Sequence, residues 1–235
     1  MASLRLDTII LPEIKGDAFY YLIQDLSQKE KIETVLEIGS SCGDGSTEAI
    51  VNGLSNNYNG APQLFCLEVS VTRFEKLVEA YKDKPFVHCY NTSSVPLHGF
   101  STAEEVKKFY HEENSIINIF PIELVLSWLE KDIKYVKDMN MNENGIERIK
   151  RENNIKYFSM VLIDGSEFTG RHELDSVYGA NILLLDDIRG FKNYHNYKRL
   201  IRDPNYYLIS QDWRVRNGYA AFSRVDGRGR VKEKN

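Results

Sequence analysis

The chain has 235 residues, enough for one large domain with an insertion. Hydrophobic residues make up 42% of it and charged residues 27%, which is typical of a globular protein, and the net charge of -4 gives no reason to expect a nucleic-acid partner. The chain has no apolar run of membrane-spanning length and no N-terminal secretory signal pattern, so we expect a cytoplasmic protein without a membrane partner.

The three cysteines, Cys42, Cys66 and Cys89, fall in or beside runs that are expected to form buried strands. Their spacing is not that of a metal site. Free thiols in a reducing compartment therefore fit the chain better than disulfides do.

We expect a single domain spanning residues 1–235. Its first helix lies within residues 1–33, where Phe19, Leu22, Ile23 and Leu26 recur at helical spacing. This helix should pack against a sheet that is built from the later segments.

Residues 34–47 contain the main functional motif that we find in the sequence. The apolar run at residues 34–38 predicts a strand that is buried on both faces. Three glycines follow, which permit positive φ and a close approach of the backbone to a ligand: Gly39, Gly43 and Gly45. Ser46 or Thr47 can then cap a helix. Such a loop at the end of a central parallel strand is where nucleotide-like ligands bind, so we interpret it as a cofactor cradle.

The glycine spacing separates two classes of cofactor. Dinucleotide sites typically have the pattern G-x-G-x-x-G, whereas this chain has E-x-G-x-x-x-G-x-G with an acid, Glu37, near the end of the strand. An acid there would repel a pyrophosphate but suits a cationic ligand. The stretch resembles motif I of the class I S-adenosylmethionine-dependent methyltransferases. The resemblance implies that Glu37 organises the site for the amino-acid part of the cofactor, which these residues contact: Gly39, Ser40, Gly43, Gly45 and Ser46. A glycine-rich turn that binds nothing is the alternative.

The second strand, residues 63–69, ends at an acid, Glu68. Its distance in sequence from Gly43 is close to the spacing at which an acid accepts hydrogen bonds from ribose hydroxyls, although it could also be a solvated strand end. The third strand, residues 86–90, is followed by Asn91 and Thr92, where the resemblance places polar contacts to the adenine.

Residues 100–150 then interrupt the alternation of strands and helices. Helical patterns cover residues 102–111 and 121–137, and a short charged helix leads back to the sheet. An insertion of this length is rarely inert, so we interpret it as a helical cap over the substrate site. An enlarged pair of surface helices, or an interface between copies of the chain, is the alternative.

Acids end the next two strands. The strand at residues 157–164 ends in Asp164, and the strand at residues 181–187 ends in Asp186 and Asp187. These carboxylates should meet on the same edge as the cradle, where they would repel one another unless a cation lies between them. Hard oxygen ligands favour Mg²⁺, with Mn²⁺ or Ca²⁺ as competitors. The alternative is that the acids only bind backbone amides or cap a turn.

The remaining elements are helices at residues 171–178 and 191–201 and strands at residues 206–210 and 219–225. We expect residues 226–235, which are charged and contain glycine, to be frayed.

Residues 163–170 together with residues 185–188 resemble the metal-dependent small-molecule O-methyltransferases, such as the catechol and sugar O-methyltransferases. The resemblance covers about residues 34–95 and 157–225. It implies a doubly wound (Rossmann-like) α/β fold with a seven-stranded, mostly parallel sheet, an antiparallel last strand and a helical insertion between strands three and four. It also implies that Asp164, Asp186 and Asp187 hold the metal and that Asp164 lies at the cofactor.

The chain departs from that group at the general base. Members often have His two residues after the first acid or Lys three residues after it, whereas this chain has Ser166 and Glu167. Besides Asp164, the catalytic candidates are therefore Glu167, His172 and His195. A lone histidine is more often structural than catalytic.

The sequence therefore predicts O-methylation of a small hydroxylated acceptor, such as a sugar, a diol or a catechol, by S-adenosylmethionine with a divalent cation. Two alternatives stay open at this point. A nicotinamide-dependent reductase would use the same type of fold and Glu68, but Glu37 and the missing G-x-G-x-x-G pattern disfavour it. A non-catalytic cofactor-binding or scaffold protein is the other.

Overall fold

The computed structural model describes residues 6–9, 11–58 and 60–225, so the tail that was expected to be frayed, residues 226–235, lies outside the described residues. The strands of the described part are β1 (Thr34–Ile38), β2 (Gln63–Leu67), β3 (Val87–Tyr90), β4 (Met160–Ile163), β5 (Ile182–Asp186), β6 (Tyr206–Asp212) and β7 (Tyr219–Arg224). The α-helices are α1 (Ala18–Lys29), α2 (Ser46–Ser55), α3 (Val71–Tyr81), α4 (Ala103–Glu112), α5 (Ile122–Asp138), α6 (Gly145–Glu152), α7 (Gly170–Val177) and α8 (Phe191–Arg202). Two short 3₁₀ helices, η1 (Leu97–Gly99) and η2 (Ile116–Ile119), flank α4.

All seven strands form one sheet in the order β3-β2-β1-β4-β5-β7-β6. The neighbouring pairs from β3 to β5 are parallel, and β7 runs antiparallel to both β5 and β6. The predicted fold class, including the antiparallel last strand, is confirmed. The direction in which the chain adds strands reverses between β1 and β4, and a ligand crevice is expected there, at the carboxyl ends of the strands.

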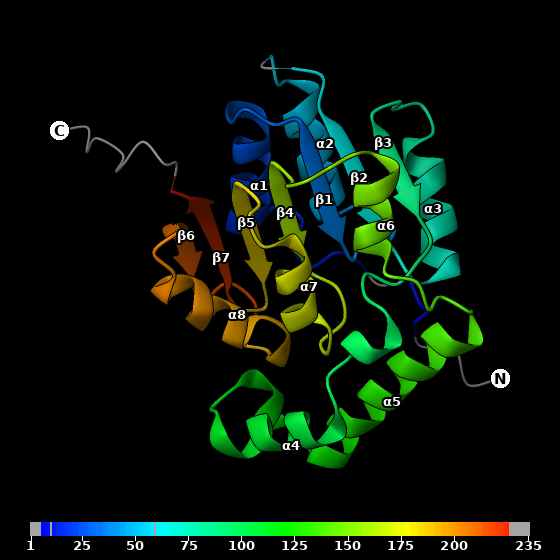
Figure 1. Ribbon diagram of the computed structural model, residues 1–235, viewed down its shortest axis with the longest axis vertical. Coiled ribbons are helices and arrows are strands. Elements are labelled where there is room, and N and C mark those ends of the chain that lie inside the picture. Colours follow the sequence, from blue (N-terminus) through cyan, green and yellow to red (C-terminus); the bar gives the residue numbers. More distant parts are fainter. Residues whose placement is uncertain (1–5, 10, 59, 226–235) are drawn as a thin grey trace.

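Helices cover both faces of the sheet (Figure 1). Apolar side chains of α1, α2 and α3 pack on one face, and those of α6, α7 and α8 pack on the other. The strands β1, β2, β4 and β5 are buried on both faces over most of their length, and this explains their continuous apolar runs, whereas β3 at the edge of the sheet is half-buried. Of the helices in the described ranges, none combines the length and the apolar character that crossing a bilayer requires.

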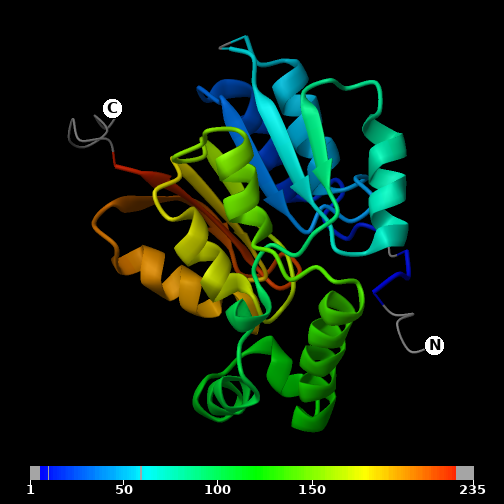
Figure 2. The ribbon, with the colours of Figure 1, turned by 45° about the vertical axis from the view of Figure 1, so that its right-hand side comes forward.

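The insertion between β3 and β4 extends past the carboxyl ends of the strands (Figures 1 and 2). The helices predicted at residues 102–111 and 121–137 are confirmed as α4 and α5, each shifted by one residue. Their apolar faces form a separate cluster around Val106, Val125 and Phe168. In contrast, α6 packs on the sheet through Ile146 and Ile149, so the last part of residues 100–150 belongs to the main core.

Candidate functional site

The loop between β1 and α2 lies at the crevice, and two of its glycines are needed there. Gly39 has φ of +88°, and a Cβ atom on it would lie 2.2 Å from the carbonyl oxygen of Asp164. Gly43 has φ of +86°, and a Cβ atom on it would lie 2.5 Å from the ring of Tyr81. Both positions combine a backbone conformation that L side chains rarely adopt with no room for a side chain. The loop can therefore approach β4 and α3 closely only with glycine at these places.

Glu37 supports this loop from inside the protein. The Thr47 hydroxyl, at the start of α2, donates a hydrogen bond of 2.6 Å to Glu37 Oε2. The side chain is fully buried, and burial raises the pKa of Glu37. Oε1 has no hydrogen-bond partner among the described residues. Glu37 thus fixes the strand to the helix rather than facing the crevice directly.

Glu68 lies on the other side of the loop, after β2. Its two oxygens accept hydrogen bonds of 2.8 Å from the backbone amides of Ser41 and Ser70, and burial raises the pKa of its carboxyl group. Each carboxylate oxygen can accept a further hydrogen bond. The side-chain amide of Asn91 donates hydrogen bonds to the carbonyl oxygens of Glu68 and Val69 and so positions the end of β2, while its contact with the cofactor stays a prediction.

Two cavities meet at the loop. The first, which we call the Glu68 cavity, has a volume of about 160 Å³, and Thr92 contributes to its wall. The second, the aspartate cavity, has a volume of about 320 Å³ and contains Asp186 and Asp187 in its wall. The two share these lining residues: Gly39, Ser41, Arg73 and Asp164. The crevice is therefore one groove with two lobes, and Ser40, Gly45 and Ser46 of the loop face the second.

Different segments of the chain line the two lobes. Phe100, Asp132 and Val136 of the insertion line the Glu68 cavity. The aspartate cavity is lined instead by residues 11–14 of the N-terminal segment. The prediction that the insertion covers the acceptor stays a prediction, but these three residues line the cavity that contains Glu68. Asp132 accepts a hydrogen bond of 2.6 Å from the Ser166 hydroxyl, and burial raises the pKa of its carboxyl group.

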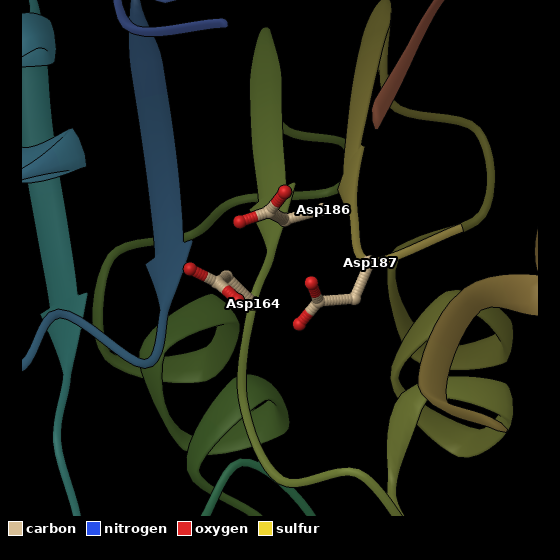
Figure 3. Close-up of side chains that lie close together, drawn as sticks. All are labelled: Asp164, Asp186 and Asp187. Carbon is tan, nitrogen blue, oxygen red and sulfur yellow. The ribbon is translucent and has the colours of Figure 1, made fainter. Parts of the chain in front are cut away.

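The structure brings the three predicted aspartates together (Figure 3). Asp164, Asp186 and Asp187 each offer a carboxylate oxygen within 4.8 Å of the others. Asp187 has φ of +56°, an uncommon conformation for a residue other than glycine, and such strain tends to occur at functional sites. By its oxygen donors, the cluster fits a divalent cation.

The charge of the cluster differs from the expectation. The sequence argument assigned charge compensation to a divalent cation, but two protein cations lie here. Lys192 Nζ lies 2.6 Å from Asp164 Oδ1 and 3.0 Å from Asp187 Oδ2. Arg216 Nη1 donates hydrogen bonds of 2.8 Å to both oxygens of Asp186, while its Nε donates to Asp17. The sequence-based argument assumed that no cationic side chain pairs with these carboxylates, and this assumption is wrong. The metal itself stays a prediction, and it rests on the carboxylate oxygens of the three aspartates.

These cations affect the aspartates differently. Burial and the neighbouring carboxylates raise the pKa of Asp164 to about 8, against the attraction of Lys192. Burial also opposes ionisation of Asp187, but Lys192 outweighs it and lowers the pKa of that carboxyl group. Burial alone would lower the pKa of Lys192, yet the surrounding acids raise it well above its usual value. Burial also raises the pKa of Asp186, against the attraction of Arg216. The acids around Lys192 therefore favour its charged form, and Asp187 is the aspartate whose ionised form is favoured.

The other three candidate bases lie outside the walls of these two cavities. Glu167 caps α8, because its Oε1 accepts hydrogen bonds from the backbone amides of Phe191 and Lys192. His195 packs against the ring of Phe109, and burial lowers its pKa. His172 packs edge-on against His98. None of the three is among the described residues that line the Glu68 cavity or the aspartate cavity.

Three residues of the site were missed from the sequence. Asp132 could have been noticed in the sequence, since it lies between Leu129 and Val136 on the apolar face of its helix, where an acid is unusual. Lys192 and Arg216 come from α8 and from the loop between β6 and β7, and no local pattern marks them. Their roles depend on the folded sheet, which brings both segments to the same edge.

No protein-family model matches the sequence, and the search of curated proteins finds no match. Solved structures match in fold. An O-methyltransferase from Bacillus cereus in complex with SAH has a TM-score of 0.53 and 12% identity, covering 94% of this chain and 89% of that one. A methyltransferase from Geobacter sulfurreducens has a TM-score of 0.51 and 10% identity, covering 91% and 81%. An SAH-bound methyltransferase from Podospora anserina has a TM-score of 0.50 and 12% identity over the same shares. The chain therefore has the fold of these methyltransferases.

Proposed function

We propose that the protein is a methyltransferase that uses S-adenosylmethionine and methylates an oxygen of a small hydroxylated acceptor, such as a sugar, a diol or a catechol-like compound. The observation that carries the proposal is the two-lobed groove at the reversal of strand order, with Glu68 in one lobe and carboxylates in the other. The fold is shared with methyltransferases, two of them solved with SAH, and this supports the choice of cofactor.

The groove offers a place for each part of the cofactor. The ribose would bind at Glu68, whose carboxylate is fixed by two backbone amides. The adenine would lie between Thr92 and the residues of the insertion in the Glu68 cavity. The amino-acid part and the sulfonium would lie along the loop at Gly39, where the two lobes meet.

The methyl group would then face the aspartate cavity. In the reaction, the acceptor oxygen bonds to the methyl carbon while the bond from carbon to sulfur breaks, and its electron pair stays on sulfur, which leaves a neutral thioether. The hydroxyl proton passes to an ionised carboxylate in the wall. Asp164, whose pKa is raised to about 8, can accept it in those molecules in which it is ionised. Holding the two reactants in line would supply much of the rate acceleration.

The sequence-based prediction also includes a bound Mg²⁺ ion. If a divalent cation is bound, Asp164, Asp186 and Asp187 would hold it, and it would lower the pKa of an acceptor hydroxyl. Because Lys192 and Arg216 already balance part of the negative charge, the reaction that we propose does not depend on it. The absence of a nucleic-acid partner, assembly through the insertion and a cytoplasmic location also stay predictions.

The experiment that tests the function is methyl transfer from isotopically labelled S-adenosylmethionine to a panel of sugars, diols and catechols, followed by mass spectrometry. We expect labelled product with at least one acceptor. Thermal stabilisation by NAD but not by SAH would support the reductase instead. Binding of SAH without transfer to any oxygen, nitrogen or carbon acceptor would support the non-catalytic alternative.

A further inference from the structure

Lys192 reaches the three aspartates from α8, inside the protein. Its Nζ contacts Asp164 and Asp187 at 2.6 and 3.0 Å, and only 4% of its side chain is exposed. Lys192 is not among the described residues that line the aspartate cavity, and it lines a different one, between α4 and α8. A molecule in the aspartate cavity would therefore meet the carboxylates, with the ammonium group behind them.

The backbone around Lys192 is fixed by its neighbours. Glu167 accepts hydrogen bonds from the amides of Phe191 and Lys192 at the start of α8. A Cβ atom on Gly170 would lie 2.1 Å from the carbonyl oxygen of Lys192, so α7 and α8 pack in direct backbone contact there. Asn196 donates a hydrogen bond of 2.8 Å to the carbonyl oxygen of Gly170 and links the same two helices. The ammonium group is thus held by a rigid support, as a preorganised site requires.

The positive charges contact the same three carboxylates that a metal would use. Lys192 engages one oxygen each of Asp164 and Asp187, and Arg216 engages both oxygens of Asp186. A divalent ion bound by the same carboxylates would lie close to a buried ammonium group, and repulsion between like charges is strong in such a weakly screened place. The oxygen donors of the cluster suit a metal, but its charges do not.

We propose that Lys192 is the resident cation of this site: it is a positioning residue that holds Asp164 and Asp187 in place and excludes a divalent metal, so that methyl transfer proceeds without one. The statement on methyl transfer rests on the proposed function, whereas the exclusion of metal does not. Lys192 therefore replaces the ion that the aspartates alone would suggest.

The test is a titration with Mn²⁺ followed by electron paramagnetic resonance, which needs no acceptor. It compares the wild type, Asp186→Asn, Lys192→Ala, the double variant Lys192→Ala with Asp187→Asn, and the control Lys198→Ala. Lys198 also lies on α8 in an ion pair, with Glu113, but is 40% exposed. Lys192→Gln, which keeps more of the side-chain volume, replaces Lys192→Ala if that variant does not fold. SAH binding is measured by calorimetry on the same samples.

We expect no bound Mn²⁺ on the wild type or on Lys198→Ala, a single new site on Lys192→Ala, and loss of that site in the double variant. A site on the wild type that Asp186→Asn abolishes would overturn the inference, and so would the lack of any site on the Lys192 variant. If the wild type fails to bind SAH while the Mn²⁺ pattern is as expected, the proposed function fails and the exclusion of metal stands.

Discussion

Among the single residues of the site, Lys192 has the largest expected effect on stability. Replacing it by methionine keeps the volume but leaves Asp164 and Asp187 without their cation. Breaking a buried ion pair in this way costs about 3–5 kcal/mol in the free energy of unfolding. We therefore expect Lys192→Met to lower this free energy by about that amount at pH 8 in urea denaturation.

The loss of unfolding free energy in Lys192→Met should depend on pH, and this dependence serves as a control for the prediction. The depressed pKa of Asp187 contributes stability above its unfolded pKa, and this contribution is lost as the pH falls through its folded pKa. Without Lys192 the aspartates bind protons more easily, so the loss in Lys192→Met should be smaller at pH 5 than at pH 8. Lys198→Met removes a partly exposed ion pair and should cost less than about 1 kcal/mol at both values. An equal, small effect of both substitutions would contradict the prediction.

Glu167 allows a second test at the residue scale. Burial raises its pKa to about 7, above the unfolded value, so the folded protein holds a proton there that the unfolded chain has released. The protonated Glu167 side chain thus contributes to the free energy of unfolding below its unfolded pKa, and this contribution is lost as the pH rises through about 7. Because glutamine stays neutral, the melting temperature of Glu167→Gln should improve relative to the wild type between pH 5 and pH 8. A constant difference in melting temperature between these two pH values would show that this carboxylate does not titrate as described.

At the scale of elements, the insertion contributes to the Glu68 cavity through α5. Asp132 lines this cavity and is bound to Ser166, which follows directly after Asp164 and Gly165 in sequence. If the adenine binds there and donates a hydrogen bond to the Asp132 carboxylate, losing that bond would cost about 1.5–3 kcal/mol. We expect Asp132→Ala to weaken SAH binding by about 10-fold or more in calorimetry.

A matched control lies on the same helix. Asp138 ends α5 in an exposed ion pair with Lys134, and Asp138→Ala should leave the affinity for SAH unchanged. The sequence-based expectation was different, since it gave the insertion a role in acceptor access more than in cofactor binding. Unchanged SAH affinity in Asp132→Ala would favour that earlier expectation over the arrangement of the cavities.

At the scale of the whole molecule, the parts of the site that follow from local patterns were predicted from the sequence. Strand ends are marked by apolar runs, and parallel strands bring their carboxyl ends to one edge, so the meeting of Asp164 with Asp186 and Asp187 could be inferred. Gly39 and Glu68 were found in the same way.

The rest depends on packing between distant segments. Arg216 reaches Asp186 only because β7 pairs with β5, and Lys192 reaches Asp164 only because α8 packs on α7. The hydrogen bonds of Glu167 and Asn91 could not be predicted for the same reason, since their partners are backbone groups of other elements. Residue types and spacing do not specify such contacts.

The central claim is that the groove binds the methyl donor, and calorimetric titration with SAH tests it most directly. We expect SAH to bind the wild type and NAD not to bind. Glu68→Ala should weaken SAH binding by about 1–3 kcal/mol through lost charge-assisted hydrogen bonds to the ribose. Glu33→Ala, an exposed acid before β1, should have no effect. The absence of SAH binding to the folded wild type, or equal affinity in Glu68→Ala, would contradict the account.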